Sequence, residues 1–253
     1  MGVIISLLNH KGGVGKTTSA INIGAGLVEL GKKALLIDLD PQANLTLSLG
    51  LPRSQHTIYQ ALRGEAPLVP VNVKEGLDVV IATLDLSGAE MELINEAGRE
   101  FILRELLEPV RLQYDYVIID CPPSLGLLTL NALTSSDMVI IPLQTEFLAM
   151  QGLAKIKQVI QKVKLRLNKK LAIGGVLATM FDSRKVLNRD VIETIQKYFG
   201  DLVFETRIRD NVALAEAPAQ RKDIFAYSRN SPGAADYLAV CQELENRVSA
   251  LVV

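Results

Sequence analysis

The stretch VIISLLNHKGGVGKTTSAINIGAGL, residues 3–27, runs from an unbroken apolar segment through a glycine-rich loop into a helix-forming segment. The apolar run Val3–Leu8 does not alternate with polar residues, which predicts a strand buried on both faces. The loop's three glycines allow a tight backbone turn, and Lys16–Leu30 has a helical pattern. A strand, a glycine loop and a helix in this order predict a cradle of backbone N–H groups that binds phosphate.

The loop departs from the usual phosphate-binding pattern Gly-x-x-x-x-Gly-Lys-Ser/Thr. His10 stands where the first glycine is expected, and Lys11 adds a second lysine. We expect Lys16 to reach the β- and γ-phosphates of ATP and the Thr17 hydroxyl to ligate Mg²⁺. The predicted nucleotide-binding loop consists of Lys11, Gly12, Gly13, Val14, Gly15, Lys16, Thr17 and Thr18.

Aspartates follow two later apolar runs. Asp38 ends LLID and Asp40 follows two residues later, and Asp120 ends YVIID. Ligands of an open parallel sheet bind beyond the carboxyl ends of its strands, so these carboxylates are expected beside the phosphate loop. The Asp120 segment has the form of a Walker B strand, whose aspartate holds Mg²⁺. Asp38 and Asp40, two residues apart, are predicted to face the metal or an attacking water.

Apolar runs alternate with helical patterns along the rest of the chain. This alternation predicts an α/β fold: a mostly parallel, twisted sheet with helices on both faces, in one domain over residues 1–253. Residues 41–76 are less regular and are expected to form a small helical excursion. Further strands are expected at 33–38, 78–82, 116–120, 137–142, 171–180 and 203–206, and helices at 99–108, 127–135, 148–167, 187–198 and 232–250.

Composition is that of an ordinary globular protein, with 49% apolar and 22% charged residues in 253. The two cysteines, Cys121 and Cys241, have no metal-ligand spacing, which favours a reducing, cytoplasmic setting. No apolar run has the length of a membrane span. Charge is uneven: residues 155–229 hold 16 Lys/Arg and 8 Asp/Glu, although the whole chain has a net charge of −1. This asymmetry predicts one face that prefers anions.

Together these motifs resemble the ParA/MinD class of P-loop ATPases with a deviant Walker A loop, and most closely the ParA/Soj partition proteins. The resemblance extends over nearly the whole chain. Besides the loop and the aspartates, it rests on Pro142-Leu143-Gln144, Gly152-Leu153, the segment 179–184, Asn211-Val212, Glu216-Ala217-Pro218 and 231–233.

The resemblance implies a role for each site residue. Lys11 would be the signature lysine, which reaches the partner's nucleotide across an ATP-bound homodimer. Such a contact in trans would stabilise phosphate charge and link ATP binding to dimerisation. The implied catalytic residues are Lys11, Lys16 and Asp40, and the metal site comprises Thr17, Asp38 and Asp120, with ATP and Mg²⁺ as cofactors. The base site would involve the segments near Met180 and at 207–218, including Met180, Arg207 and Pro218.

The resemblance also implies nonspecific binding to double-stranded DNA and a ParB-like or other adaptor that stimulates slow hydrolysis. The protein would be cytoplasmic and nucleoid-associated, without stable membrane association. One departure concerns Ala213, which stands where family members often have an arginine implicated in DNA contact. The implied DNA-binding residues are Arg184, Lys185, Arg189, Arg209 and Arg221.

Three alternatives stay open at this point. A MinD-like membrane-associated ATPase requires a basic amphipathic helix, whereas the C-terminal segment 244–253 is short and nearly uncharged. A reductase like the nitrogenase iron protein requires cysteines that bridge a dimer through a cluster. A ParA-like ATPase that positions a protein organelle would have almost the same sequence features, because the cargo is specified by the partner.

Overall fold

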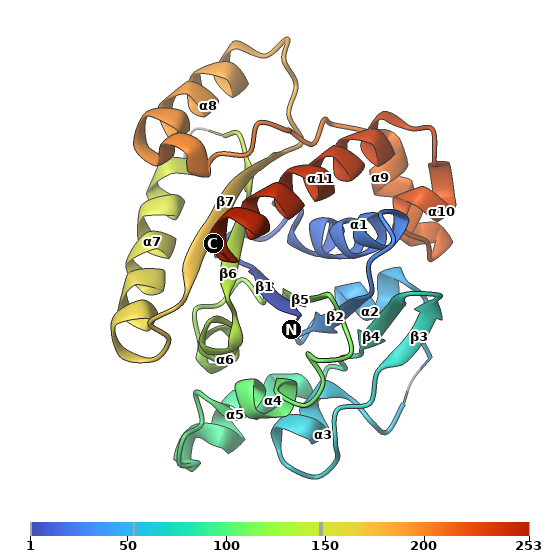
Figure 1. The fold of residues 1–253 in the computed structure, drawn as a ribbon, viewed down its shortest axis with the longest axis vertical. Helices are drawn as coiled ribbons and strands as arrows, with labels where there is room; N and C mark the ends of the chain where they lie inside the picture. Colours follow the sequence, from blue (N-terminus) through green and yellow to red (C-terminus); the bar gives the residue numbers. More distant parts are fainter. Residues whose placement is uncertain (1, 53, 147–148, 253) are drawn as a thin grey trace.

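The computed structural model describes residues 2–52, 54–146 and 149–252. Its centre is a seven-stranded sheet with the order β3-β4-β2-β5-β1-β6-β7 (Figure 1). All neighbouring strands are parallel except β3 and β4. The strands are β1 (Val3–Leu7), β2 (Ala34–Asp38), β3 (Val71–Lys74), β4 (Leu77–Val80), β5 (Tyr116–Asp120), β6 (Met138–Gln144) and β7 (Ala172–Thr179).

Helices cover both faces of this sheet, so the predicted fold class is confirmed. The helix α1 (Lys16–Glu29) packs with α2 (Asn44–Ser48), α10 (Ile224–Ser228) and α11 (Pro232–Val252) on one face. The opposite face carries α3 (Ile58–Leu62), α4 (Leu86–Glu92), α5 (Ile102–Leu107), α6 (Leu127–Ser135), α7 (Ala149–Arg166) and α8 (Val186–Phe199). The remaining short elements are α9 (Val212–Glu216) and the 3₁₀ turns η1 (Leu93–Asn95), η2 (Gly200–Leu202) and η3 (Ala217–Gln220).

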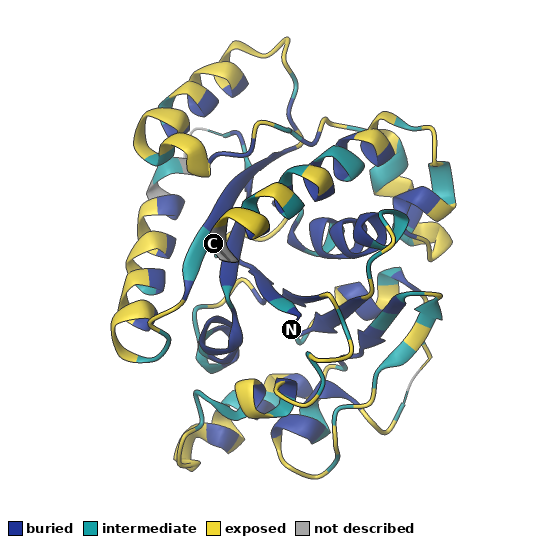
Figure 2. Cartoon of the chain, viewed as in Figure 1, coloured by how far each residue is buried: buried dark blue, intermediate teal, exposed yellow. Residues whose placement is uncertain are grey.

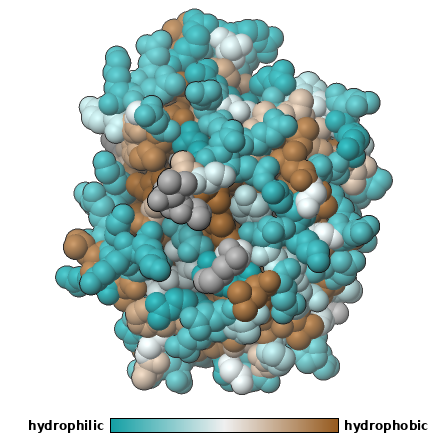
Figure 3. Space-filling model, in the orientation of Figure 1, coloured by the Kyte–Doolittle hydropathy of each residue, from teal (hydrophilic) through white to brown (hydrophobic). Residues whose placement is uncertain are grey.

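Burial explains why the central strands are continuously apolar. Every residue of β2 and β5 is buried, because helices shield the sheet on both sides (Figure 2). The outer sides of the helices are exposed, and hydrophilic side chains cover most of the face shown in Figure 3. No helix within the described ranges is long and apolar enough to cross a bilayer.

Two local expectations differ from the structure. Residues 203–206 do not form a strand; Val203 makes only an isolated bridge to Val176, because η2 ends immediately before it. The excursion at 41–76 contains the predicted short helices but ends in β3, an unpredicted antiparallel edge strand. Its four residues, Val71–Lys74, are too few for the alternation of apolar and polar residues to stand out.

Candidate active site

The glycine loop lies between β1 and α1, as predicted. Gly13 and Gly15 have φ values of 75° and 82°, a left-handed conformation that glycine adopts without steric cost. Gly15 is also the N-cap of α1, and no side chain caps the helix there. Among the described residues, the first N–H groups of α1 therefore have no side-chain acceptor, and together with the helix dipole they favour an anionic ligand.

Neighbouring strands hold the loop in this shape. The Asn9 side chain donates to the Pro142 carbonyl at 2.8 Å and accepts from the Lys11 N–H at 3.0 Å. On the other side, the Thr179 hydroxyl donates to the Val14 carbonyl at 2.8 Å. The backbone that would contact phosphate is thus fixed by β6 and β7 before any ligand binds.

The two loop lysines have different environments. Lys16 is buried, and its Nζ donates to the Lys11 carbonyl at 3.3 Å, inside the loop. The side chain of Lys11 is 50% exposed and forms an ion pair with Glu146, which is 45% exposed. Lys16 is therefore placed for a ligand in its own loop, whereas Lys11 lies at the surface.

Thr17 and Asp120 form the part of the site that fits a metal ion. The Thr17 hydroxyl donates to Asp120 Oδ2 at 2.7 Å, while Oδ1 is buried with no hydrogen-bond partner in the described structure. Burial raises the pKa of the Asp120 carboxyl, and the nearby Asp38 raises it further. A buried carboxylate oxygen without a partner is costly, and Mg²⁺ with its waters would satisfy it.

Asp38 lies beside Asp120, as the paired residues of β2 and β5. Its carboxylate already accepts hydrogen bonds from the Thr46 hydroxyl at 2.6 Å and the Thr46 N–H at 2.9 Å. Burial raises the pKa of Asp38 to about 6, and the bonds from Thr46 oppose that rise. In this structure Asp38 holds α2 in place through these hydrogen bonds from Thr46. Its contribution to the metal site stays a prediction.

Asp40 lies in the turn after β2. It is buried, and its Oδ1 accepts from the Gln42 N–H at 3.0 Å. Ala43, three residues on, has a φ of 52°, a conformation that non-glycine residues rarely adopt. The turn that carries Asp40 is thus a strained segment between two ordered elements, and such strain is common in turns of active sites.

A cavity of about 260 Å³ opens beside the glycine loop. Met180, which the resemblance assigns to the base site, lines this cavity and has a left-handed φ of 51°. Arg207 and Pro218 do not line it; Arg207 instead stacks over the Phe181 ring at 4.6 Å. The other lining residues are Gly15, Thr18, Thr179, Ile208, Arg209, Asp210, Asn211, Leu214, Ala215 and Tyr237.

Most of these lining residues fall in the loop or in the segments near Met180 and at 207–218 that the resemblance assigns to the base site, whereas Tyr237 was not predicted from sequence. Within the segment 207–218, the Asn211 side chain accepts from the Ala213 N–H and caps α9. Tyr237 carries no local signal: it lies in α11, more than two hundred residues from the loop, and its buried hydroxyl contacts Ser19 at 3.1 Å. Only the packing of α11 on α1 brings it to the cavity.

The predicted DNA-binding residues form one group and one outlier. One group lies at the start of α8 and consists of Arg184, Lys185 and Arg189. Arg209 lies close to this group, because its backbone forms an isolated β-bridge with Phe181. Arg221 lies elsewhere, against Gly50 after α2. Two of the arginines are held by carboxylates: Arg184 by Asp182 at 2.9 Å and Arg209 by Asp236 at 2.7 Å.

A family model described as an AAA domain matches residues 2–173. The sporulation initiation inhibitor protein Soj of Bacillus subtilis is 47% identical over 249 residues, which are 96% of this chain and 98% of Soj. The chromosome partitioning protein ParA of Myxococcus xanthus is also 47% identical, over 98% of this chain and 89% of that protein. The chain belongs to the ParA/Soj family of P-loop ATPases.

Solved structures agree with this family assignment. A cobyrinic acid a,c-diamide synthase from Mycobacterium smegmatis, crystallised with ADP and magnesium, superposes with a TM-score of 0.86 at 36% identity over 99% of this chain and 96% of that one. The septum site-determining protein MinD from Pyrococcus horikoshii, complexed with Mg-ADP, has a TM-score of 0.80 at 25% identity over 99% of each chain. The ParA/Soj sheet and loop described above are thus shared with nucleotide-bound proteins.

The cysteines do not fit a reductase in this ParA/Soj family member. Cys121 and Cys241 are both buried, in the cores on opposite faces of the sheet. Burial raises the pKa of Cys121 to about 12, so the thiol stays protonated. A cluster shared between two subunits needs thiolates that reach a surface.

Proposed function

We propose that this protein is an ATP-dependent switch of the ParA type that partitions DNA. Mg-ATP binding drives formation of a homodimer, the dimer binds double-stranded DNA without sequence preference, and a ParB-like partner stimulates slow hydrolysis that releases it. The observation that carries the proposal is the pair of lysines on one loop, with Lys16 buried towards its own phosphate site and Lys11 exposed.

The nucleotide site supports the first step. Lys16 and the uncapped N–H groups of α1 would hold the phosphates of ATP. Thr17 and Asp120 would hold Mg²⁺. The charge of the ion would stabilise the negative charge that develops on the phosphate oxygens in the transition state. The cavity lined by Met180 would take the base. The N–H of Gln42 orients Asp40, which is the candidate for positioning or activating water.

Lys11 supports the dimerisation step. Within the residues that the structure describes, Glu146 is the one ion-pair partner of Lys11, and this pair is half exposed and weak. A second subunit would offer phosphates, which are stronger partners for an ammonium group. If Lys11 left Glu146 and bound a phosphate of the partner subunit's ATP, dimerisation would be linked to ATP binding.

The basic surface and the named relatives support the DNA step. Arg184, Lys185 and Arg189 are exposed at the start of α8, where phosphate contacts need only cations on one surface. Two relatives that are 45% or more identical over nearly the whole chain are called chromosome partitioning proteins. DNA is therefore the favoured cargo.

DNA binding in different nucleotide states tests the proposal. We expect filter or anisotropy assays to show binding with Mg-ATP, and weak binding with ADP or without nucleotide. Asp40→Ala should slow ATP hydrolysis by at least about 100-fold and prolong the DNA-bound state. Equal DNA binding in every nucleotide state would rule out the switch.

Lys11→Ala separates dimerisation from ATP binding. The variant should still bind a fluorescent ATP analogue, because Lys16 and the loop backbone remain, but it should stay monomeric in sedimentation. Lys16→Ala is the matched variant and should lose the nucleotide itself. If the Lys11→Ala variant dimerises with ATP as the wild type does, the proposed contact between Lys11 and the partner subunit's ATP is wrong.

A further inference from the structure

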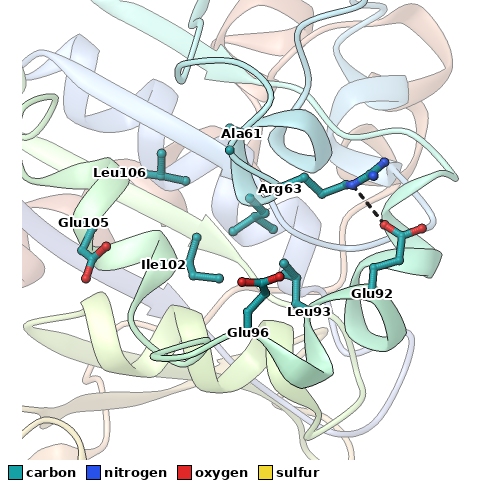
Figure 4. A pocket seen from close by; sticks show the side chains of 10 residues that line it. Ala61, Arg63, Glu92, Leu93, Glu96, Ile102, Glu105 and Leu106 are labelled. Atoms are coloured by element: carbon teal, nitrogen blue, oxygen red, sulfur yellow. Dashed lines mark ion pairs between the residues drawn. The ribbon is translucent and has the colours of Figure 1, made fainter.

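A cavity of about 570 Å³ lies between α3, the α4–η1 segment and α5, in the part of the molecule that covers one face of the sheet (Figure 4). None of its lining residues belongs to the candidate active site. They come from residues 61–64, 92–96 and 102–106. Nothing in the proposed ATPase cycle uses this cavity.

The floor of the cavity is apolar. Leu62 and Leu93 are buried, and Ile102 and Leu106 are half-buried. Figure 4 shows Leu93, Ile102 and Leu106 around the cavity. The aliphatic side chains of Ile102 and Leu106 pack in part against the core, and their remaining exposed surface lines the cavity. Such a floor favours an apolar side chain from a ligand.

The rim is acidic and its charge is not balanced. Arg63 is occupied by ion pairs with Glu92 at 3.3 Å and Glu65 at 3.0 Å. The two other rim carboxylates, Glu96 and Glu105, are exposed and have no ion-pair partner within the described ranges. Two carboxylates that form no ion pair with the described residues therefore flank an apolar floor.

We propose that this cavity is a docking site for a basic segment of a partner protein, with an aliphatic side chain on the floor and lysine or arginine at Glu96 and Glu105. Charge complementarity selects a cation and repels nucleic acid phosphate. The apolar floor selects a peptide over a small cation, because a polyamine would leave Ile102 and Leu106 in contact with water.

The position of the cavity links it to the Walker B segment. In α4, Glu90 accepts a hydrogen bond from the Leu128 N–H at 3.2 Å, at the start of the helix that follows Asp120. In α6, Asn131 accepts from the Leu103 N–H at 3.0 Å. Both walls of the cavity are thus bonded to α6, so a bound segment is placed to alter ATP hydrolysis; this consequence rests on the proposed function.

Short fluorescein-labelled peptides test the docking site by anisotropy without nucleotide. The probe alternates lysine and leucine; one control peptide replaces leucine with serine, another replaces lysine with glutamate, and spermidine is a competitor. We expect only the lysine–leucine peptide to bind well, with salt weakening it. Equal binding of the serine peptide, or full competition by spermidine, would overturn the proposal, because the floor would then be irrelevant.

Variants locate the binding. The double variant Glu96→Gln/Glu105→Gln should lower the affinity for the peptide by about 3- to 10-fold, because each exposed ion pair contributes little free energy on its own. Glu108→Gln with Glu75→Gln removes two exposed carboxylates outside the cavity and should change nothing. Methyl NMR should show peptide-induced shifts at Ile102 and Leu106. The proposed site would be overturned if both double variants lost peptide affinity to a similar extent, or if the methyl signals of Ile102 and Leu106 did not shift.

ATP hydrolysis provides the second measurement. If docking acts through α6, the lysine–leucine peptide should change the hydrolysis rate of the wild type but not of the Glu96→Gln/Glu105→Gln variant. An unchanged rate with the peptide bound overturns the link while the docking site stands. If the protein does not hydrolyse ATP at all, the proposed function fails, and the anisotropy result still decides the docking site.

Discussion

Thr46 connects the catalytic edge of the sheet to the irregular excursion after β2. Its hydroxyl donates to Asp38 at 2.6 Å and accepts from the Ala82 N–H at 3.0 Å. Thr46→Val removes both bonds without changing the side-chain shape and leaves a buried carboxylate partly unsatisfied. We expect the free energy of unfolding to fall by about 1–3 kcal/mol, measured by urea denaturation.

Thr134 is the matched control for this substitution. It is buried in α6, and its hydroxyl has no hydrogen-bond partner among the described residues. Thr134→Val therefore removes an unsatisfied hydroxyl, and the free energy of unfolding should stay equal or rise. Equal losses for the two variants would show that Thr46 acts through packing and not through its bonds to Asp38.

Glu146 competes with a partner subunit for Lys11 in the proposed cycle. Because both side chains are about half exposed, Glu146→Gln should change the free energy of unfolding by less than about 1 kcal/mol. With ATP it should strengthen the dimer by up to about 5-fold, since Lys11 no longer has to leave an ion pair. Sedimentation velocity with a nonhydrolysable ATP analogue measures this change.

Glu193→Gln serves as the control, because Glu193 is exposed on α8 and has no ion pair within the described ranges. It should leave the dimer constant unchanged. A weaker dimer in Glu146→Gln would mean that Glu146 stabilises the assembled state and does not compete with it.

At the scale of elements, α1 shows how tightly the loop-bearing helix is held. An added Cβ on Gly26 would lie 2.7 Å from Cys241 Sγ, in α11. Gly26→Ala gains about 1 kcal/mol of helix propensity but overpacks the contact by about 1–3 kcal/mol. We expect a net loss of stability in urea denaturation, and a partial rescue when Cys241→Ala removes the sulfur, which a double-mutant cycle would detect.

Gly88 in α4 is the control for Gly26. An added Cβ there meets only the end of the flexible Glu92 side chain, at 3.3 Å. Gly88→Ala should raise the free energy of unfolding by about 0.5–1 kcal/mol through helix propensity alone. A loss of stability at both glycines would show that the α1–α11 contact is not the cause.

Which elements were predictable follows from how they are stabilised. The strands β1, β2 and β5 are buried on both faces, so their unbroken apolar runs stand out in the sequence. The edge strand β3 is short and partly exposed, and only pairing with β4 defines it. The positions of the loop, Asp38, Asp40 and Asp120 were predictable because each ends a strand or lies within a few residues of its carboxyl end. The roles of Glu146 and Thr46 could not be predicted, because they arise from tertiary contacts that no local sequence pattern indicates.

For the whole molecule, the uneven charge of the sequence becomes two separate surfaces. Cations dominate α7 and the start of α8, whereas the cavity between α3 and α5 is rimmed by glutamates. The candidate active site lies at the carboxyl edge of the sheet. If both proposals hold, DNA and a basic protein segment would bind at once without competing, since each surface repels the other ligand.

The salt dependence of DNA binding tests the cationic surface. Each phosphate contact contributes a slope of about −0.9 to the plot of log binding constant against log salt concentration. Removal of two contacts, by Arg184→Ala with Lys185→Ala, should therefore weaken binding and flatten the slope by about 2. Anisotropy titrations of a duplex with Mg-ATP, at several salt concentrations, measure both effects. Lys33→Ala with Arg104→Ala removes the same charge from exposed positions away from α8 and should leave the slope unchanged. Equal slopes for the wild type and the Arg184/Lys185 variant would exclude this surface, because a lost phosphate contact must release fewer counterions.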